Sequence, residues 1–285
     1  MLVIPAPGQW KLRTTSAAPA MRAAAPARPR PGLATGTRGA SRARPLAGTV
    51  VGIDPGHNGR SWSDPSFINH LIWNGREWES CDTTGTATDG GYTEAQFNWN
   101  VAFQTAADLR ALGARVVLTR HGNDGIGPCV TQRIATFNRA HVNVALSIHA
   151  DGGPPGGRGF TVLEPVADGI NSRVIRPSRR FAAILRNVYG RLSGMPVSTY
   201  DGVDGLQPRD NLAGENLTRV PYALIECGNM RNATDAALLT SATFQRRAAA
   251  AISAAIERFL RPRTQREARR SPRRIGPDAR RVAPA

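Results

Sequence analysis

Short runs rich in β-branched residues alternate with longer amphipathic runs between residues 49 and 260. This alternation is typical of a mostly parallel, twisted β-sheet with helices on both faces. We therefore predict an α/β fold in a single domain, with any active site at the carboxyl ends of the strands. The expected strands are Thr49–Asp54, Arg115–Thr119, Val144–Ile148, Gly159–Leu163 and Tyr222–Ile225. The expected helices are Glu94–Leu112, Val130–Ala140, Ser178–Leu192 and Asp235–Leu260.

The two ends of the chain differ from this central segment in composition. Residues 1–48 and 261–285 are rich in Arg and Pro, show no helical or strand period, and carry almost all of the formal net charge of +16. Segments of this kind bury too little apolar surface to fold. We predict a disordered basic leader or tail at 1–48, a folded domain at 49–260 and a disordered Arg/Pro-rich tail at 261–285.

The strongly basic composition raises the alternative of a nucleic-acid-binding protein that acts through its Arg-rich ends. These ends contain one aromatic residue, Trp10, so they lack the side chains on which bases stack. Residues 49–260 are nearly neutral, with a net charge of +1. We predict no nucleic-acid partner.

Apolar runs and cysteines set two further limits. No apolar run reaches the roughly 18 residues of a membrane-spanning helix, so we predict no membrane span. The N-terminus lacks the continuous apolar segment of a secretory signal, so the sequence shows no clear signal peptide. Three cysteines, Cys81, Cys129 and Cys227, are too few for a four-cysteine zinc site.

Potential metal ligands follow or end three of the expected strands, and a fourth begins a helix. His57, His149 and Glu226 lie at strand ends, and Glu94 stands where a long loop meets the first helix. Two histidines and a glutamate suit a catalytic zinc ion, and a further carboxylate can move protons. We expect His57, Glu94 and His149 to be the ligands and Glu226 to be the base.

Each of these residues also has a structural alternative. A single histidine at a strand end is often only a hydrogen-bonded loop residue. Glu94 can instead be a first-turn acid that complements the helix dipole. A structural role is harder to assign to Glu226, because it follows an apolar run and would need a buried partner.

Four motifs together resemble the zinc-dependent N-acetylmuramoyl-L-alanine amidases of the amidase-3 type, in particular the mycobacterial and related actinobacterial cell-wall members. The motifs are GIDPGHNG at 52–59, Glu94 at the start of a helix, SIHAD at 147–151 and IECGN at 225–229. The resemblance covers 49–260 and implies that His57, Glu94 and His149 bind one Zn²⁺ while Glu226 is catalytic. It identifies 49–260 as the zinc amidase catalytic domain.

The implied reaction is hydrolysis of the amide between N-acetylmuramic acid and the L-alanine of the stem peptide. The resemblance implies peptidoglycan or muropeptide substrates, a periplasmic or extracytoplasmic location at the cell wall, and a monomer. A non-catalytic peptidoglycan-binding relative is the alternative. Such a protein would normally have lost a ligand or the glutamate, and this chain has all four.

Two pairs of residues stand around the expected centre. Asp54 and Asp151 lie close in sequence to His57 and His149, so either can accept an imidazole N–H or simply cap a loop.

The loop 58–93 is long enough to be a functional lid. The resemblance supports a Cys81–Cys129 disulfide that ties this loop to the domain, with Cys227 as a small buried side chain. Three free thiols are the alternative in a reducing compartment.

Overall fold

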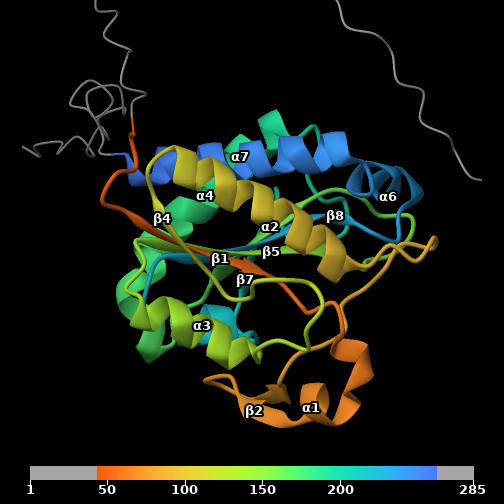
Figure 1. The fold of residues 1–285 in the computed structure, drawn as a ribbon, viewed down its shortest axis with the longest axis horizontal. Helices are drawn as coiled ribbons and strands as arrows, with labels where there is room; N and C mark the ends of the chain where they lie inside the picture. Colours follow the sequence, from red (N-terminus) through yellow and green to blue (C-terminus); the bar gives the residue numbers. More distant parts are fainter. Residues whose placement is uncertain (1–43, 262–285) are drawn as a thin grey trace, which may run out of the picture. The chain divides into compact units, whose positions relative to one another are not determined.

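The computed structural model describes residues 44–261, which form a mixed sheet with helices on both faces (Figure 1). The strand order is β4-β1-β5-β8-β6-β7, and only the β6–β8 pair is antiparallel. The predicted mostly parallel α/β fold is confirmed. The strands are β1 (Val50–Pro55), β4 (Arg115–Leu118), β5 (Val144–Asp151), β6 (Thr161–Pro165), β7 (Leu206–Arg209) and β8 (Tyr222–Asn229).

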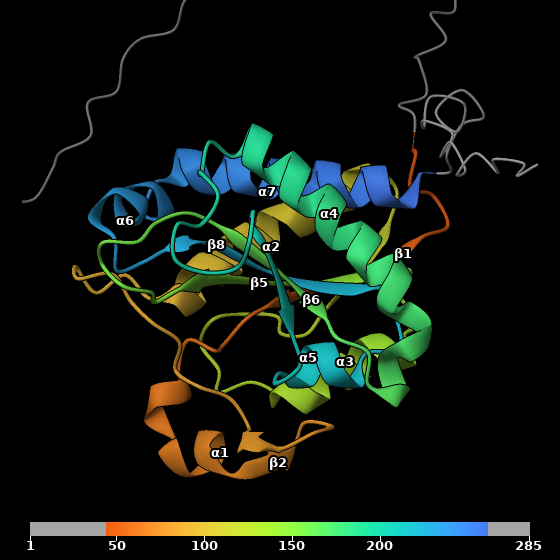
Figure 2. The ribbon, with the colours of Figure 1, turned by 180° about the vertical axis from the view of Figure 1, so that it is seen from behind.

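Two helical layers cover the sheet. In Figures 1 and 2, α2, α4 and α7 lie over one face, while α3 and α5 lie over the other. The helices are α2 (Glu94–Ala111), α3 (Val130–Arg139), α4 (Ile175–Leu192), α5 (Ala213–Leu217), α6 (Ala233–Leu239) and α7 (Ala242–Leu260), with a 3₁₀ segment η2 (Gly169–Val174) before α4. No helix among residues 44–261 is long and apolar enough to cross a membrane.

The alternation of side chains along each strand separates two cores. Val51 and Ile53 of β1 pack in the larger core beneath α2, α4 and α7. On the opposite face, Gly52 lies against the ring of Phe137, and a Cβ on Gly52 would come within 2.5 Å of that ring. The smaller core around Phe137 therefore needs a glycine in β1 so that α3 can approach the sheet.

Several boundaries differ from those predicted. The expected helix 235–260 is two helices, because the Ser241 hydroxyl accepts the N–H of Phe244 and starts α7 as a separate helix. The short edge strand β7 was not predicted, and it carries Pro208, which an edge strand tolerates. The folded unit also starts before residue 49, since Leu46 is fully buried in the larger core. Most of the two predicted tails lies outside the described residues.

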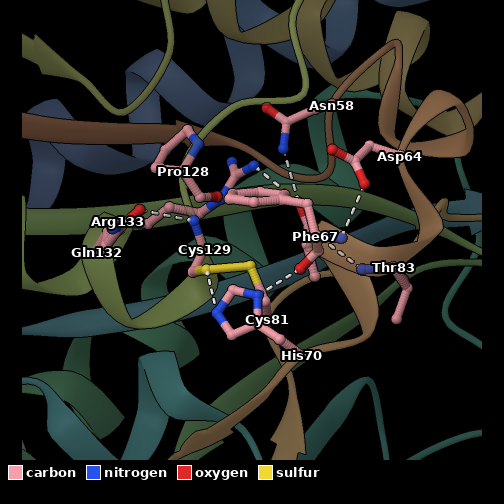
Figure 3. The surroundings of a disulfide bond; sticks show 11 residues. Asn58, Asp64, Phe67, His70, Cys81, Thr83, Pro128, Cys129, Gln132 and Arg133 are labelled. Carbon is pink, nitrogen blue, oxygen red and sulfur yellow. Dashed lines mark hydrogen bonds and ion pairs between the residues drawn. A yellow bond between two sulfur atoms is a disulfide. The ribbon is translucent and has the colours of Figure 1, made fainter.

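The long loop of the prediction contains a small lobe, residues 58–80, here called the hairpin lobe. It consists of η1 (Ser61–Ser63), α1 (Pro65–Asn69) and an antiparallel hairpin of β2 (Leu71–Trp73) and β3 (Trp78–Ser80). A disulfide joins Cys81, directly after β3, to Cys129 at the start of α3 (Figure 3). This is the pairing that the resemblance implied, and Cys227 is free and buried.

The disulfide should supply much of the stability that holds the hairpin lobe to the domain. It closes a loop of 48 residues, and closure entropy alone predicts a loss of about 4 kcal/mol in the free energy of unfolding when both Cys81 and Cys129 become Ala. Urea unfolding of the two proteins measures this difference. Adding a reductant should lower the midpoint of the wild-type protein and leave that of the variant unchanged. Equal midpoints without reductant would contradict the prediction.

Candidate metal centre

The polar side chains of the site share one face of the sheet. Side chains two positions apart on a strand point to the same face of the sheet. Asp54 of β1 therefore lies on the face of Gly52. By the same rule, His149 of β5 and Glu226 of β8 lie on the face that carries the smaller core. His149 and Glu226 are direct neighbours in the β5–β8 register. The site therefore lies at the carboxyl ends of the strands, as predicted, on the face that carries α3 and α5.

Three candidate ligands converge around one carboxylate oxygen. Glu94 Oε1 lies 3.2 Å from His57 Nε2 and 2.9 Å from His149 Nδ1. One donor atom from each of the three residues lies within 4.8 Å of the others. Ligand distances of 2.0–2.2 Å in a tetrahedral zinc site place neighbouring donors about 3.3 Å apart, so this spacing suits such an ion.

Two glycines allow the backbone to approach these side chains. A Cβ on Gly56 would lie 2.1 Å from the His149 ring. Gly85 has a φ of +70°, and its Cβ would lie 2.7 Å from His57 and 2.8 Å from Glu94. His57 itself has a φ of +56°, a conformation that non-glycine residues seldom adopt. The left-handed backbone of His57 raises the free energy of the folded state, and the surrounding contacts must offset this cost.

Glu94 owes its position to the start of α2. The Thr93 side chain caps this helix by accepting the N–H of Gln96, so Glu94 is the first residue of the first helical turn. Glu94 Oε2 accepts the N–H of Thr86 at 3.0 Å. Burial alone would raise the pKa of Glu94, but the imidazoles of His57 and His149 hold it well below its usual range. The carboxylate is therefore ionised and suited to a cation.

The opposite shift is found for the two groups that face this carboxylate. Burial opposes protonation of His57, yet Glu94 and Asp82 raise its pKa well above the ordinary value. Burial raises the pKa of Glu226 well above its usual range, and the negative charges of Glu94 and Asp151 add to this effect. Glu226 Oε2 is buried, and no hydrogen-bond partner for it lies within residues 44–261. Such an unpaired carboxylate beside a cluster of ligands is a candidate acid or base.

Neither Asp54 nor Asp151, the two aspartates expected beside the histidines, makes a direct hydrogen bond to an imidazole in the described part of the chain. Asp54 accepts the hydroxyl of Ser147 at 2.7 Å, and that hydroxyl lies 3.1 Å from His149 Nε2, so Asp54 reaches the histidine only through Ser147. Asp151 accepts the hydroxyl of Tyr200 instead. In this structure the two carboxylates bond to Arg133 and Ser147 (Asp54) and to Tyr200 (Asp151).

Asp82 and Thr83 take the place expected for these aspartates. His57 Nδ1 lies 3.1 Å from the Thr83 carbonyl oxygen and 3.4 Å from Asp82 Oδ1. These contacts orient the ring so that Nε2 points at Glu94. Sequence reasoning missed both residues, although Asp82 follows Cys81 directly, and a disulfide at Cys81 places it beside the domain.

Arg133 is a second functional residue that the sequence analysis missed. Its guanidinium donates to Asp54 at 2.8 Å, to Asp82 at 3.1 Å and to the carbonyl oxygen of His57 at 3.0 Å. Although burial opposes the shift, this guanidinium helps to lower the pKa of Asp54 to about 2. The available signal was an arginine on the apolar face of α3, next to Ile134, where a charge needs buried partners.

The remaining histidines lie outside this cluster. His70 stands beside the disulfide, with Nε2 at 3.6 Å from Cys129 Sγ, but sulfurs joined in a disulfide are not thiolate ligands. His121 and His141 are exposed. None of the three is part of the His57–Glu94–His149 cluster.

A cavity of about 170 Å³ extends from the two ligand histidines between α3, α5 and the hairpin lobe. Its lining is largely apolar and includes Ile134, Phe137 and Leu224. Glu215 of α5 also lines it, and within residues 44–261 neither of its buried carboxylate oxygens has a hydrogen-bond partner. Burial raises the pKa of Glu215 to about 8, so the carboxyl group is mostly neutral at pH 7.

Comparisons with known proteins agree with this geometry. The family model described as N-acetylmuramoyl-L-alanine amidase, of the amidase-3 type, matches residues 51–258. This chain belongs to that family. An N-acetylmuramoyl-L-alanine amidase of Mycobacterium tuberculosis is 41% identical over 225 residues, which is 79% of this chain and 90% of the relative.

Solved structures show the same relationship for this amidase. The crystal structure of an N-acetylmuramyl-L-alanine amidase from Mycobacterium smegmatis has a TM-score of 0.70 and 41% identity, covering 75% of this chain and 98% of that chain. The apo form from Mycobacterium abscessus has a TM-score of 0.70 and 40% identity, covering 75% of this chain and all of that chain. An amidase of Nostoc punctiforme, 21% identical with a TM-score of 0.58, covers 76% of this chain and 99% of its own and shares the fold.

The buried Glu215 predicts an unusual pH dependence of stability. Its pKa is about 8 in the folded protein and about 4.5 as an ordinary glutamate, so between these values the unfolded state binds fewer protons. The free energy of unfolding should therefore fall as pH rises from about 4.5 to 8, by about 1.4 kcal/mol per pH unit from this group. Glu215→Gln removes this contribution, so its stability relative to wild type should increase from pH 5 to pH 8. Urea unfolding at both pH values gives the two slopes, and parallel slopes would contradict the prediction.

Proposed function

We propose that this amidase uses one zinc ion, held by His57, Glu94 and His149, to hydrolyse the amide between N-acetylmuramic acid and the L-alanine of the stem peptide. The observation that carries the proposal is the convergence of two imidazole nitrogens, His57 Nε2 and His149 Nδ1, on Glu94 Oε1, with Glu226 in the strand next to His149. Family membership supports the amidase reaction, and the donor set supports the metal. The mass of the products formed from purified muropeptides tests the bond that is cleaved.

The residues present fit zinc in number and chemistry. Two imidazole nitrogens and one carboxylate oxygen leave a fourth position for water or substrate, which is the pattern of catalytic zinc sites. The depressed pKa of Glu94 and the short donor spacing both favour a cation among these side chains. Zinc, when bound, supplies Lewis acidity toward the scissile carbonyl and the attacking water.

Glu226 has the features of the proton carrier in this reaction. Its strand places it beside His149, and its Oε2 atom is not engaged by any other described side chain. The carboxylate would accept a proton from the attacking water and deliver it to the departing L-alanine nitrogen. A raised pKa suits this double role, because the same group must bind and release a proton near neutral pH.

The remaining parts of the proposal concern where and how the enzyme works. We propose an extracytoplasmic location, which the proposed peptidoglycan substrate and the Cys81–Cys129 disulfide, typical of an oxidising compartment, both support. We propose a monomer with one catalytic domain, which we extend from 49–260 to include the buried Leu46. The proposed substrates are peptidoglycan and its muropeptide fragments.

The ligand assignment predicts the metal content of variants. His57→Ala, Glu94→Ala and His149→Ala should each lose tight zinc binding, because two remaining ligands do not hold a tetrahedral site. Elemental analysis of the purified proteins measures the zinc-to-protein ratio. His121→Ala, which removes an exposed histidine outside the cluster, should keep the wild-type ratio. A full zinc complement in any of the three variants would remove that residue from the ligand set.

The role of Glu226 predicts a separation between metal binding and turnover. Glu226→Gln keeps the size of the side chain, so the protein should retain zinc while losing about 10²–10⁴-fold in kcat. Muropeptide hydrolysis followed by mass spectrometry gives the rate. If kcat stays near the wild-type value, another group carries the proton.

A further inference from the structure

The outer face of the hairpin in the hairpin lobe is apolar and uncovered. The β2–β3 register pairs Trp73 with Trp78 and Leu71 with Ser80. Because side chains alternate along a strand, these four lie on one face, while Ile72 and Glu79 lie on the other. Leu71 is 63% exposed, Trp73 49% and Trp78 64%. We call Leu71, Trp73 and Trp78 the tryptophan face.

Polar contacts hold this hairpin in a fixed position, so its exposure is not that of a loose loop. The opposite face contacts the domain, where Glu79 accepts the N–H of Ala213 at 3.2 Å. At the turn, the fully buried Asn74 holds the loop and Arg76 pairs with two aspartates. The contacts at the turn are Asn74 Nδ2 to the Asn211 carbonyl oxygen, Arg76 Nε to Asp168 and Arg76 Nη1 to Asp210.

The two tryptophan rings fix each other and still leave a large surface exposed. They form an edge-to-face pair with centroids 5.7 Å apart and an interplanar angle of 66°. About half of Trp73 and 64% of Trp78 remain exposed in this arrangement. An isolated two-stranded hairpin gains little from exposing two tryptophans, and large exposed apolar side chains in one patch mark interaction sites. The three residues of the tryptophan face and Ser80, which lies on the same side of the hairpin, carry no charge, which fits an uncharged partner.

The hairpin continues directly into the catalytic region. Glu79 lines the cavity that reaches His57 and His149. Three residues after it, Asp82 contacts the His57 ring. The tryptophan face therefore belongs to the same protein segment as Glu79 and Asp82, which reach the cluster where the scissile amide of a polymeric substrate would bind.

We propose that the tryptophan face binds the glycan strand of the substrate, at pyranose rings beyond the muramic acid that carries the scissile amide. This inference rests on the proposed function, which makes the substrate a polymer of N-acetylated sugars. Pyranose rings present faces of C–H groups that stack on indole rings, and their acetamido and hydroxyl groups carry no charge. The expected ligand is therefore a neutral oligosaccharide, and its binding site is separate from the residues that cleave the amide.

Binding of a soluble glycan without peptide tests the proposal. The probe is the β-1,4-linked tetramer of N-acetylglucosamine, titrated into the full-length protein by calorimetry. Replacing Trp73 and Trp78 together with Ala should weaken binding by about tenfold or more, as removal of aromatic anchors does. Trp78→Tyr alone keeps an aromatic face and should lose less. Phe103→Ala, which removes a 56% exposed aromatic on α2, is the matched control and should bind like wild type.

A second measurement separates glycan binding from catalysis. Turnover of a single-sugar muropeptide should change less than twofold in the double variant, whereas turnover of polymeric peptidoglycan should fall. Unchanged tetramer affinity in a folded double variant overturns the proposal. Loss of lipid-vesicle binding or of self-association, without loss of tetramer binding, assigns the face to a membrane or a second copy and also overturns it.

The two proposals fail in different ways. If the wild-type protein binds the tetramer through the tryptophan face but releases no L-alanine peptide from muropeptides, the proposed function fails and the glycan site stands. If muropeptides are cleaved and the tetramer does not bind, the catalytic proposal stands and the glycan site is wrong.

Discussion

The guanidinium of Arg133 joins three parts of the site that lie far apart in the sequence. It donates to Asp54 near the end of β1, to Asp82 directly after the disulfide-bonded Cys81, and to the carbonyl oxygen of His57, whose backbone is in the left-handed conformation. A buried arginine needs such partners, and its positive charge in turn stabilises the two buried carboxylates. The backbone conformation of His57 and the position of Asp82 behind its ring therefore depend on α3. Loss of this one side chain would leave two buried negative charges beside the ligand cluster.

Charged side chains form an inner and an outer group around the proposed metal position. Arg133 pairs with Asp54 and Asp82 and offsets one of their two negative charges. Glu94 is left as the ionised acid among the imidazoles, while Glu226 lies one strand away with a raised pKa. The pKa values of these two glutamates are shifted in opposite directions because their neighbours differ: imidazoles surround Glu94, whereas Glu226 is buried near other carboxylates.

Sequence predicted the features that depend on local pattern. The order of the predicted strands and helices follows from periodicity, whereas the four candidate site residues and the cysteine pair follow from the resemblance to a known family. Contacts between distant segments were not predictable in this way: Arg133 meets Asp82 across 51 positions and Asp54 across 79. The hairpin was missed because its strands have three residues each and one face is not covered. The break before α7 was missed because Thr240 and Ser241 interrupt an otherwise continuous apolar stripe with a single capping side chain.

The positive φ of His57 has a consequence for the proposed metal site. The ring is oriented by backbone and carboxylate contacts within the chain, and the glycines at 56 and 85 leave space that only these side chains fill. The contacts that orient these side chains come from the chain itself, so the cost of arranging them is part of the free energy of folding. If zinc binds here as proposed, the ion can enter and leave a domain that is already folded.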